Sequence, residues 1–320
     1  MQQDLSQKRV FAIINPVAGG GRCRAIWEKM LPQLEAGLPD FFWQYTESAE
    51  SAPLQVRRAI CEQGAQVIVV VGGDGCMHDA LNGLLEDDAL LREDLVFVAY
   101  QAGSGCDLAR TIYEGKQPPL LQLLREGVVQ RVDIGRCDHI NHAGQPAHRY
   151  FLNASDVGVG AETCVMINRK NGLLKRVLRN GKLVFGIAGF LALLTMKYQK
   201  MHIYADDRHY EGRYMLAALG NGRYMGGAML LFPEARMDDG EMELLFAEKM
   251  GWLEICRFFL KVYDGSVVKL KKVHTERCSH LRVEVEGKPL VFELDGELPG
   301  TSPAEFTILP KALPLLFPGA

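Results

Sequence analysis

Residues 66–84, QVIVVVGGDGCMHDALNGL, place a buried strand, a glycine turn and a helix directly one after another. The apolar residues 67–71 do not alternate with polar ones, which predicts a strand buried on both faces of a parallel sheet. The turn GGDG follows, and helical spacing of apolar residues starts near Met77. Glycines allow close approach of the backbone to a ligand, and a helix start offers unpaired N–H groups to an anion. The stretch therefore predicts an anion site in an α/β domain; a tight loop capped by Asp74 is the alternative.

Two more apolar strands run into glycine loops. Residues 9–14, RVFAII, lead into NPVAGGG at 15–21, and residues 95–100, LVFVAY, lead into QAGSGCDLAR at 101–110. The carboxyl ends of parallel strands share one edge of a sheet, where α/β proteins bind ligands. We therefore expect the three glycine loops to form one binding site.

From about residue 128 the pattern changes to short strand-like segments joined by polar turns, which predicts an antiparallel β-sandwich. A chain of 320 residues also exceeds what one core usually supports. We predict a nucleotide-binding α/β domain over 1–128 and a β-sandwich domain over 129–303. The tail 304–320 is expected to return to the first domain.

A helical insertion is predicted within the sandwich, at 161–200. Its first half is basic, and its second half contains LVFGIAGFLALLTM at 183–196, which has no charge. That stretch is shorter than the roughly 18 residues needed to span a bilayer. One interpretation is a basic and apolar element that contacts a membrane or an acyl chain. The other is a helix buried against the sandwich.

Composition limits the partners and the compartment. A net charge of −3 provides no basic field, so nucleic acid is not an expected partner. The eight cysteines are scattered without zinc-ligand spacing, and the N-terminus lacks the apolar region of a signal peptide. These features favour a cytoplasmic protein with reduced thiols. The oligomeric state is open, with a homodimer as a candidate.

Five motifs, in this order, resemble those of the diacylglycerol kinase catalytic family, which groups bacterial lipid kinases with sphingosine and ceramide kinases. They are NPVAGGG at 15–21, GGDGCMHDALNGL at 72–84, AGSGCDLAR at 102–110, NGRYMGGAMLLFPEARMDDGEMEL at 221–244 and LDGE at 294–297. The resemblance implies a mostly parallel, NAD-kinase-like α/β domain followed by a β-sandwich domain that receives the lipid. It places the active site in the cleft between them.

The resemblance also implies an activity, the transfer of the γ-phosphate of Mg-ATP to the hydroxyl of a lipid such as diacylglycerol. The enzyme would work peripherally at the inner face of the membrane. Residues at family positions that line the nucleotide are Asn15, Pro16, Gly19, Thr46, Gly72, Gly73, Asp74, Gly75, Cys76, Met77, His78, Gly103 and Ser104.

Catalytic and metal roles follow from the same resemblance. Asp74 would act on the catalytic Mg²⁺, and Glu297 matches the proposed general base, with Asp295 beside it. A second Mg²⁺ would be held by the carboxylate of Asp239 and the backbone carbonyls of Arg236 and Glu241. Phosphoryl transfer requires these groups, because charge on the γ-phosphate must be neutralised and an oxygen nucleophile held in line.

Two cysteines depart from the family pattern. Cys76 stands where Thr is usual and Cys106 where Asn is usual, and a thiol is a weak hydrogen-bonding group. Losing one contact to a charged phosphate costs about 1.5–3 kcal/mol, so we expect altered nucleotide contacts. The alternatives are a catalytically silent nucleotide- or lipid-binding protein and a soluble-substrate kinase similar to NAD kinase.

Overall fold

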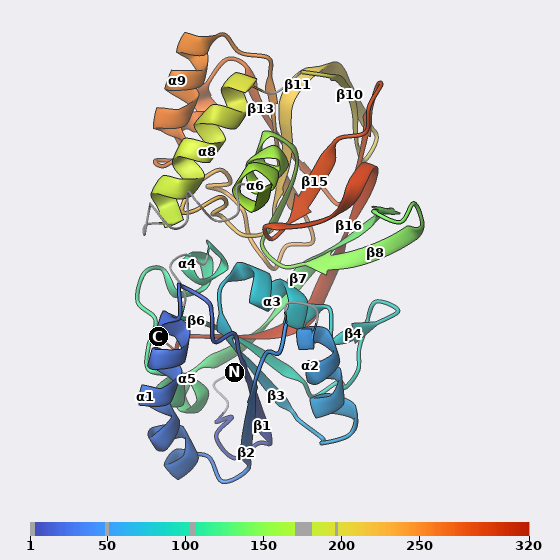
Figure 1. Ribbon diagram of the computed structural model, residues 1–320. Helices are drawn as coiled ribbons and strands as arrows, with labels where there is room; N and C mark the ends of the chain where they lie inside the picture. Colours follow the sequence, from blue (N-terminus) through green and yellow to red (C-terminus); the bar gives the residue numbers. More distant parts are fainter. Residues whose placement is uncertain (1–3, 49–50, 103–106, 170–180, 196–197, 320) are drawn as a thin grey trace. The chain divides into compact units, whose positions relative to one another are not determined.

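The computed structural model describes residues 4–48, 51–102, 107–169, 181–195 and 198–319 (Figure 1). The chain forms two compact units. The first unit comprises Met1–Asp133 and Lys311–Ala320, and the second unit is Ile134–Pro310. The limits 128/129 and 303/304 remain our proposals for the domain boundaries.

The first unit is built on a parallel sheet with the strand order β16-β6-β3-β1-β2, in which only the end of β16 takes part. The residues of β1 are all buried, as are those of β3, so helices and loops cover both faces of the sheet. The strands are β1 Val10–Ile14, β2 Phe41–Tyr45, β3 Val67–Gly72, β6 Val96–Gln101 and β16 Glu297–Phe317.

In the described parts of the first unit, five helices and a small hairpin accompany the sheet. The indole of Trp27 packs against Phe41 and, edge-on, against Trp43, which fixes the first helix over the sheet. The elements are α1 Arg22–Gly37, α2 Ser51–Cys61, α3 Asp74–Leu81, α4 Asp107–Tyr113, α5 Leu120–Glu126, β4 Leu85–Glu86 and β5 Ala89–Leu90.

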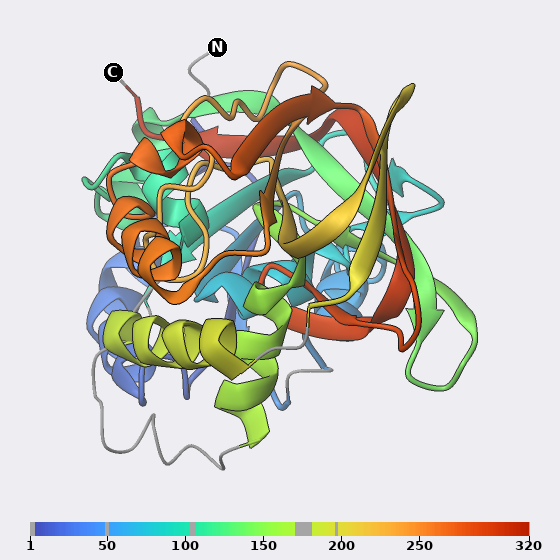
Figure 2. The same cartoon turned by 90° about the horizontal axis from the view of Figure 1, so that it is seen from above.

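The second unit is antiparallel and closes on itself. Hydrogen-bonded neighbours run in a ring, β10-β11-β9-β15-β16-β14 and back to β10. Figure 2 shows its yellow to red strands curving around a common interior, which is filled by side chains that include Phe151, Phe246, Phe292 and Phe306. Its strands are β7 Val128–Asn141, β8 Pro146–Phe151, β9 Ala154–Gly158, β10 Lys200–Ala205, β11 Arg208–Gly220, β12 Met242–Glu248, β13 Val273–Cys278, β14 His280–Val285 and β15 Val291–Leu294, together with β16.

The helices of the second unit are α6 Val159–Arg169, α8 Gly181–Thr195 and α9 Trp252–Lys261, with a short 3-10 turn at Ser266–Lys269. Among the described side chains of α8, Ala188, Ala192 and Leu193 are buried, whereas Ile187 and Leu191 are exposed. The apolar part of the predicted insertion thus has some side chains buried against the second unit and others exposed to solvent. Most of its basic half, residues 170–180, lies outside the described residues.

No helix in the described parts of the chain is long and apolar enough to cross a bilayer.

A buried carboxylate starts α6. Asp156, at 1% exposure, accepts hydrogen bonds from the backbone N–H groups of Gly160 and Ala161, at 3.1 and 2.6 Å. These bonds favour the charged form, but burial outweighs them and raises the pKa of Asp156 to about 7. The nearby Glu162 carboxylate adds to the rise.

Asp156 should make the stability of this protein fall as pH rises. Its pKa in the folded state is above the unfolded value of 3.8, so its favourable contribution is complete below that value and is lost as pH rises toward 7. The rise of the pKa from 3.8 to about 7 limits the loss to roughly 4 kcal/mol. Asp156→Asn cannot ionise, so wild type should lose stability relative to this variant between pH 4 and 8 in urea unfolding. Asp207→Asn, at an exposed aspartate, is the control. Parallel pH profiles of wild type and Asp156→Asn would contradict the assignment.

Candidate active-site residues

The predicted glycine loops leave the first unit's sheet at one edge. Ile14, the last residue of β1, pairs with Tyr45 on one side and Val71 on the other, and Gly72 pairs with Gln101. The segments that follow β1, β2, β3 and β6 therefore start side by side. Thr46, the first residue after β2, donates its N–H to the carbonyl of Ile14 at 2.9 Å.

The first loop presents an open backbone. Gly19, Gly20 and Gly21 have φ values of 61°, 70° and 89°, a run of left-handed conformations that favours glycine. A Cβ added at Gly20 or Gly21 would meet nothing within 4 Å, so the loop is open on that side. Helix α1 begins here with no side-chain cap and no acid in its first turn. Its N-terminal N–H groups and dipole therefore suit an anion such as phosphate.

The GGDG turn packs tightly against this loop. A Cβ added at Gly72 would lie 2.8 Å from Cβ of Cys76 and 3.7 Å from Cβ of Asn15, so these residues are neighbours and only glycine fits. Asn15 uses its own side-chain oxygen to accept the N–H of Val17 at 3.2 Å.

Cys76, Met77 and His78 are buried, at 6%, 1% and 4% exposure. Burial raises the pKa of the Cys76 thiol to about 12, so it is neutral at physiological pH and a weak donor. For Met77 and His78, contact with a nucleotide would come mainly through the backbone.

Asp74 links two of the predicted loops. It is the first residue of α3, and its carboxylate accepts the N–H groups of Asp107 and Leu108 at 3.0 and 3.3 Å. It thereby caps the start of α4, within the AGSGCDLAR motif. A carboxylate is also a type of ligand that Mg²⁺ prefers, so Asp74 stays the candidate magnesium ligand. Gly103, Ser104 and Cys106 of that motif lie outside the described residues.

In the second unit the DGE motif forms a tight hairpin between β15 and β16. Asp295 and Gly296 have φ values of 50° and 92°, and Leu294 pairs with Glu297 across the turn. The buried carboxylate of Asp295 accepts three backbone N–H groups, from Leu152 at 2.9 Å, Asn153 at 2.9 Å and Ala154 at 3.0 Å. Glu297, two residues on, is exposed.

The NGRY segment, residues 221–224, is hydrogen-bonded to the same stretch of backbone, residues 152–153. Asn221 is fully buried and donates its Nδ2 to the carbonyl of Leu152 at 2.7 Å and its backbone N–H to the carbonyl of Asn153 at 2.9 Å. The Nδ2 of Asn153 donates to the carbonyl of Tyr224 at 2.9 Å. Two distant motifs thus meet at residues 152–154. Asn221 opens one of the five motifs, but the sequence assigned no role to it or to Asn153.

At the Asp239 turn a guanidinium takes the place expected for a metal. Asp239 accepts the N–H of Glu241 at 3.3 Å through one oxygen and the Nη2 of Arg277 through the other. Arg277 also contacts the Glu241 carboxylate at 2.9 Å. Arg236 points its Nε to Asp238 at 3.4 Å. An arginine is always protonated, so these residues do not fit a divalent cation at this carboxylate.

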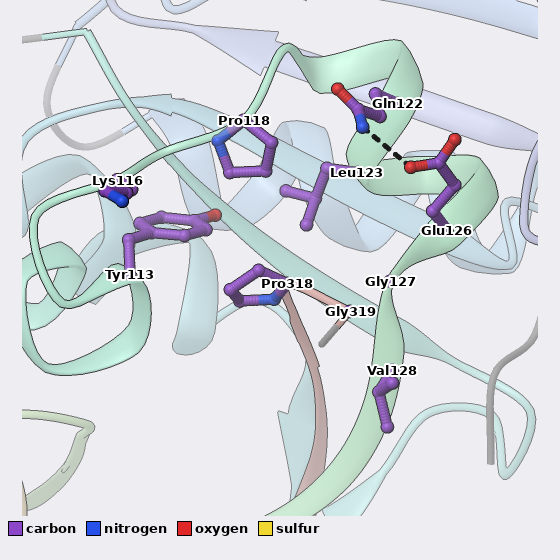
Figure 3. A pocket seen from close by; sticks show the side chains of 10 residues that line it. All are labelled: Tyr113, Lys116, Pro118, Gln122, Leu123, Glu126, Gly127, Val128, Pro318 and Gly319. Atoms are coloured by element: carbon purple, nitrogen blue, oxygen red, sulfur yellow. Dashed lines mark hydrogen bonds between the residues drawn. The ribbon is translucent and has the colours of Figure 1, made fainter.

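One pocket of the first unit, of about 660 Å³, lies apart from the predicted residues (Figure 3). In it, Gln122 donates to Glu126 at 2.7 Å. The residues that line it come from the end of α4, from α5 and the segments on either side of it, and from the end of the chain: Tyr113, Lys116, Pro118, Gln122, Leu123, Glu126, Gly127, Val128, Pro318 and Gly319. It contains none of the candidate site residues.

Two family models match successive parts of the chain. Residues 9–137 match the diacylglycerol kinase catalytic domain, and residues 155–317 match the YegS C-terminal NAD kinase beta sandwich-like domain. The chain belongs to the diacylglycerol kinase family.

Relatives of this kinase family align over nearly the whole chain. A diacylglycerol kinase of Staphylococcus saprophyticus is 26% identical, and the alignment covers 98% of this chain and 96% of that protein. One of Staphylococcus aureus is also 26% identical, over 98% of this chain and 93% of that protein.

Solved structures agree on the fold. A putative diacylglycerol kinase from Bacillus anthracis superposes with a TM-score of 0.74 at 22% identity, over 97% of both chains. Yeast NADH kinase superposes with a TM-score of 0.50 at 9% identity, over 98% of this chain and 84% of that chain. The predicted fold class, an NAD-kinase-like α/β domain followed by an antiparallel β-sandwich domain, is confirmed, and the strands of the β domain close into a ring.

Asp295 and Glu297 should differ sharply in their effect on stability. Asp295→Asn keeps a residue suited to the turn but replaces one carboxylate oxygen with an NH2 group, which turns a donor toward at least one buried N–H and removes the charge from the other bonds. It should lower the free energy of unfolding by about 2–4 kcal/mol. Glu297→Gln changes an exposed side chain and should stay within about 0.5 kcal/mol of wild type. Urea unfolding of the two variants checks this. Equal losses in both would show that the carboxylate of Asp295 does not hold the hairpin.

Proposed function

We propose that this protein is an ATP-dependent lipid kinase, a phosphotransferase with an alcohol acceptor. The observation that carries the proposal is the contrast within the DGE hairpin of a diacylglycerol kinase family member. Asp295 is fixed by three backbone N–H groups, while Glu297 is exposed beside it. A base must reach the acceptor hydroxyl, and a fixed hairpin holds that base in position.

The reaction assigns a role to each group. Mg-ATP supplies the phosphoryl group, with part of its charge neutralised by the metal. The open backbone at Gly19–Gly21 and the start of α1 bind phosphate oxygens, and Asp74 contributes a carboxylate to the magnesium. Glu297 accepts the proton of the lipid hydroxyl as its oxygen attacks the γ-phosphorus and ADP leaves. Asp295 acts as a positioning residue.

The other residues predicted to line the nucleotide belong to the same proposal. They are Asn15, Pro16, Thr46, Gly72, Gly73, Gly75, Cys76, Met77, His78, Gly103 and Ser104.

Diacylglycerol is the first substrate to test, because the relatives from both Staphylococcus species are named diacylglycerol kinases. Monoacylglycerol, phosphatidylglycerol, ceramide and sphingoid bases complete the panel. NAD belongs in it as well, since yeast NADH kinase shares the fold.

The kinase assay should separate chemistry from folding. Wild type should transfer label from γ-labelled ATP to a lipid of the panel in mixed micelles. Glu297→Gln should reduce kcat by roughly 10²–10⁴-fold, because the base is lost, with an unchanged Tm. The matched control is Glu211→Gln, an exposed glutamate of the same unit, which should keep wild-type activity. Labelling of NAD alone, or equal activity of Glu297→Gln and wild type, would contradict the proposal.

We also propose peripheral contact with the cytoplasmic face of a membrane, through α8 and α9. These helices pack together, with the rings of Phe190 and Phe259 6.0 Å apart. Of the nine large hydrophobic side chains exposed in the described parts of the chain, six lie on or just after these two helices. They are Ile187, Leu191, Trp252, Leu253, Leu260 and Tyr263.

Charge around α9 favours an anionic surface. Residues 249–272 contain six basic and two acidic side chains, in a chain whose net charge is −3. On α9 itself, Ile255 and Phe258 are buried while Leu253 and Leu260 are 61% and 76% exposed. An apolar surface with a basic border matches an interfacial membrane element.

Vesicle binding tests this surface. Leu253→Ser with Leu260→Ser should reduce co-sedimentation with vesicles containing phosphatidylglycerol by roughly tenfold or more, because two inserting side chains are lost. Leu54→Ser, at a residue of the first unit that is 63% exposed, is the control and should bind as wild type does. Unchanged binding of the double variant would show that this face does not meet the membrane.

A further inference from the structure

Three carboxylates crowd one edge of the second unit. Asp239 lies in the turn before β12, Glu241 directly precedes that strand and Glu243 is its second residue. Residues two apart in a strand point to the same side, which places Glu241 beside Glu243. The turn at Gly240, with a φ of 78°, brings Asp239 to them, and its carboxylate accepts the N–H of Glu241. The Asp239 and Glu243 side chains are only 19% and 12% exposed. Like charges so placed repel one another, and a cation among them relieves that repulsion.

Arg277 of β13 supplies that cation. The strand register places it directly opposite Glu243. Its three nitrogens each meet a different acid: Nη2 contacts Asp239, Nη1 lies 2.9 Å from Glu241 and Nε lies 3.2 Å from Glu243. The guanidinium is planar and rigid, so one side chain can bridge all three carboxylates.

A divalent ion would compete for the same oxygens. Mg²⁺ needs near-octahedral oxygen ligands at about 2.0–2.1 Å. Here one oxygen of Asp239 accepts the N–H of Glu241 and the other meets the guanidinium. Mg²⁺ on that carboxylate would also lie beside a permanent positive charge.

We propose that Arg277 replaces a structural metal ion at this turn, so that the second unit is held together here by a built-in cation and has no divalent cation site at Asp239. This inference does not rest on the proposed kinase activity, because it concerns only how the turn 236–241 is held. A guanidinium cannot be removed by a chelator and keeps its charge at any pH the protein tolerates. The half-exposed cluster should instead respond to ionic strength.

The first measurement uses wild type without nucleotide. Its Tm should be the same in EDTA and in millimolar Mg²⁺. Calorimetric titration with Mn²⁺ should give the same result for wild type and Asp239→Asn. A site in wild type that Asp239→Asn abolishes would overturn the proposal, because metal and guanidinium would then share the turn.

The second measurement removes the cation. Arg277→Gln leaves three carboxylates without their shared partner, so its Tm in EDTA should fall by roughly 3–8 °C. Millimolar Mg²⁺ should restore most of the loss, and Mn²⁺ titration should show one new site. That site should disappear in Arg277→Gln with Asp239→Asn. If Arg277→Gln shows no rise in Tm with Mg²⁺ and no new Mn²⁺ site, the inference is contradicted.

Arg282→Gln is the matched control. Arg282 is an arginine of the same unit with similar exposure, and it pairs with Glu284. This variant should gain no divalent site and should keep the Tm of wild type within about 1 °C. A metal response equal to that of Arg277→Gln would show that loss of any surface arginine produces it, and the proposal would fail.

Discussion

Side-chain carboxylates that accept backbone N–H groups position the loops on which this protein depends. Asp74 binds two N–H groups at the start of α4, Asp156 binds two at the start of α6, and Asp295 binds three in the connection between β8 and β9. An acid that accepts several N–H groups fixes the backbone segment that donates them, here the start of a helix or the connection between two strands. Two of these three acids lie in motifs that the family resemblance assigns to catalysis.

The cost of these interactions differs with their surroundings. Asp156 is enclosed so completely that burial raises its pKa to about 7 despite the two N–H groups. Asp74, the first residue of α3, is less enclosed and is the proposed magnesium ligand. The same local bond therefore acts in one place as a fold element and in another as part of a proposed binding site.

The sequence predicted the parts of the fold that depend on local pattern. The unbroken apolar runs at 10–14 and 67–71 indicated buried parallel strands, and the glycines after them indicated loops at one edge. The role of Asp295 could not be read in this way, because its three partners lie about 140 residues away. Arg277 was missed for the same reason: nothing in the chain shows that it pairs with Glu243 until the register of β12 and β13 is known.

The order of synthesis follows from the way the chain is divided. The second unit is one continuous segment, whereas the first unit needs residues 311–320, which leave the ribosome only after the whole second unit has been made. Leu315 pairs with Phe97 in the sheet, and the N–H of Lys311 donates to the buried Asp133 at 2.6 Å. During translation the first unit therefore waits with one edge of its sheet uncovered, a period in which a chaperone has an exposed strand edge to protect.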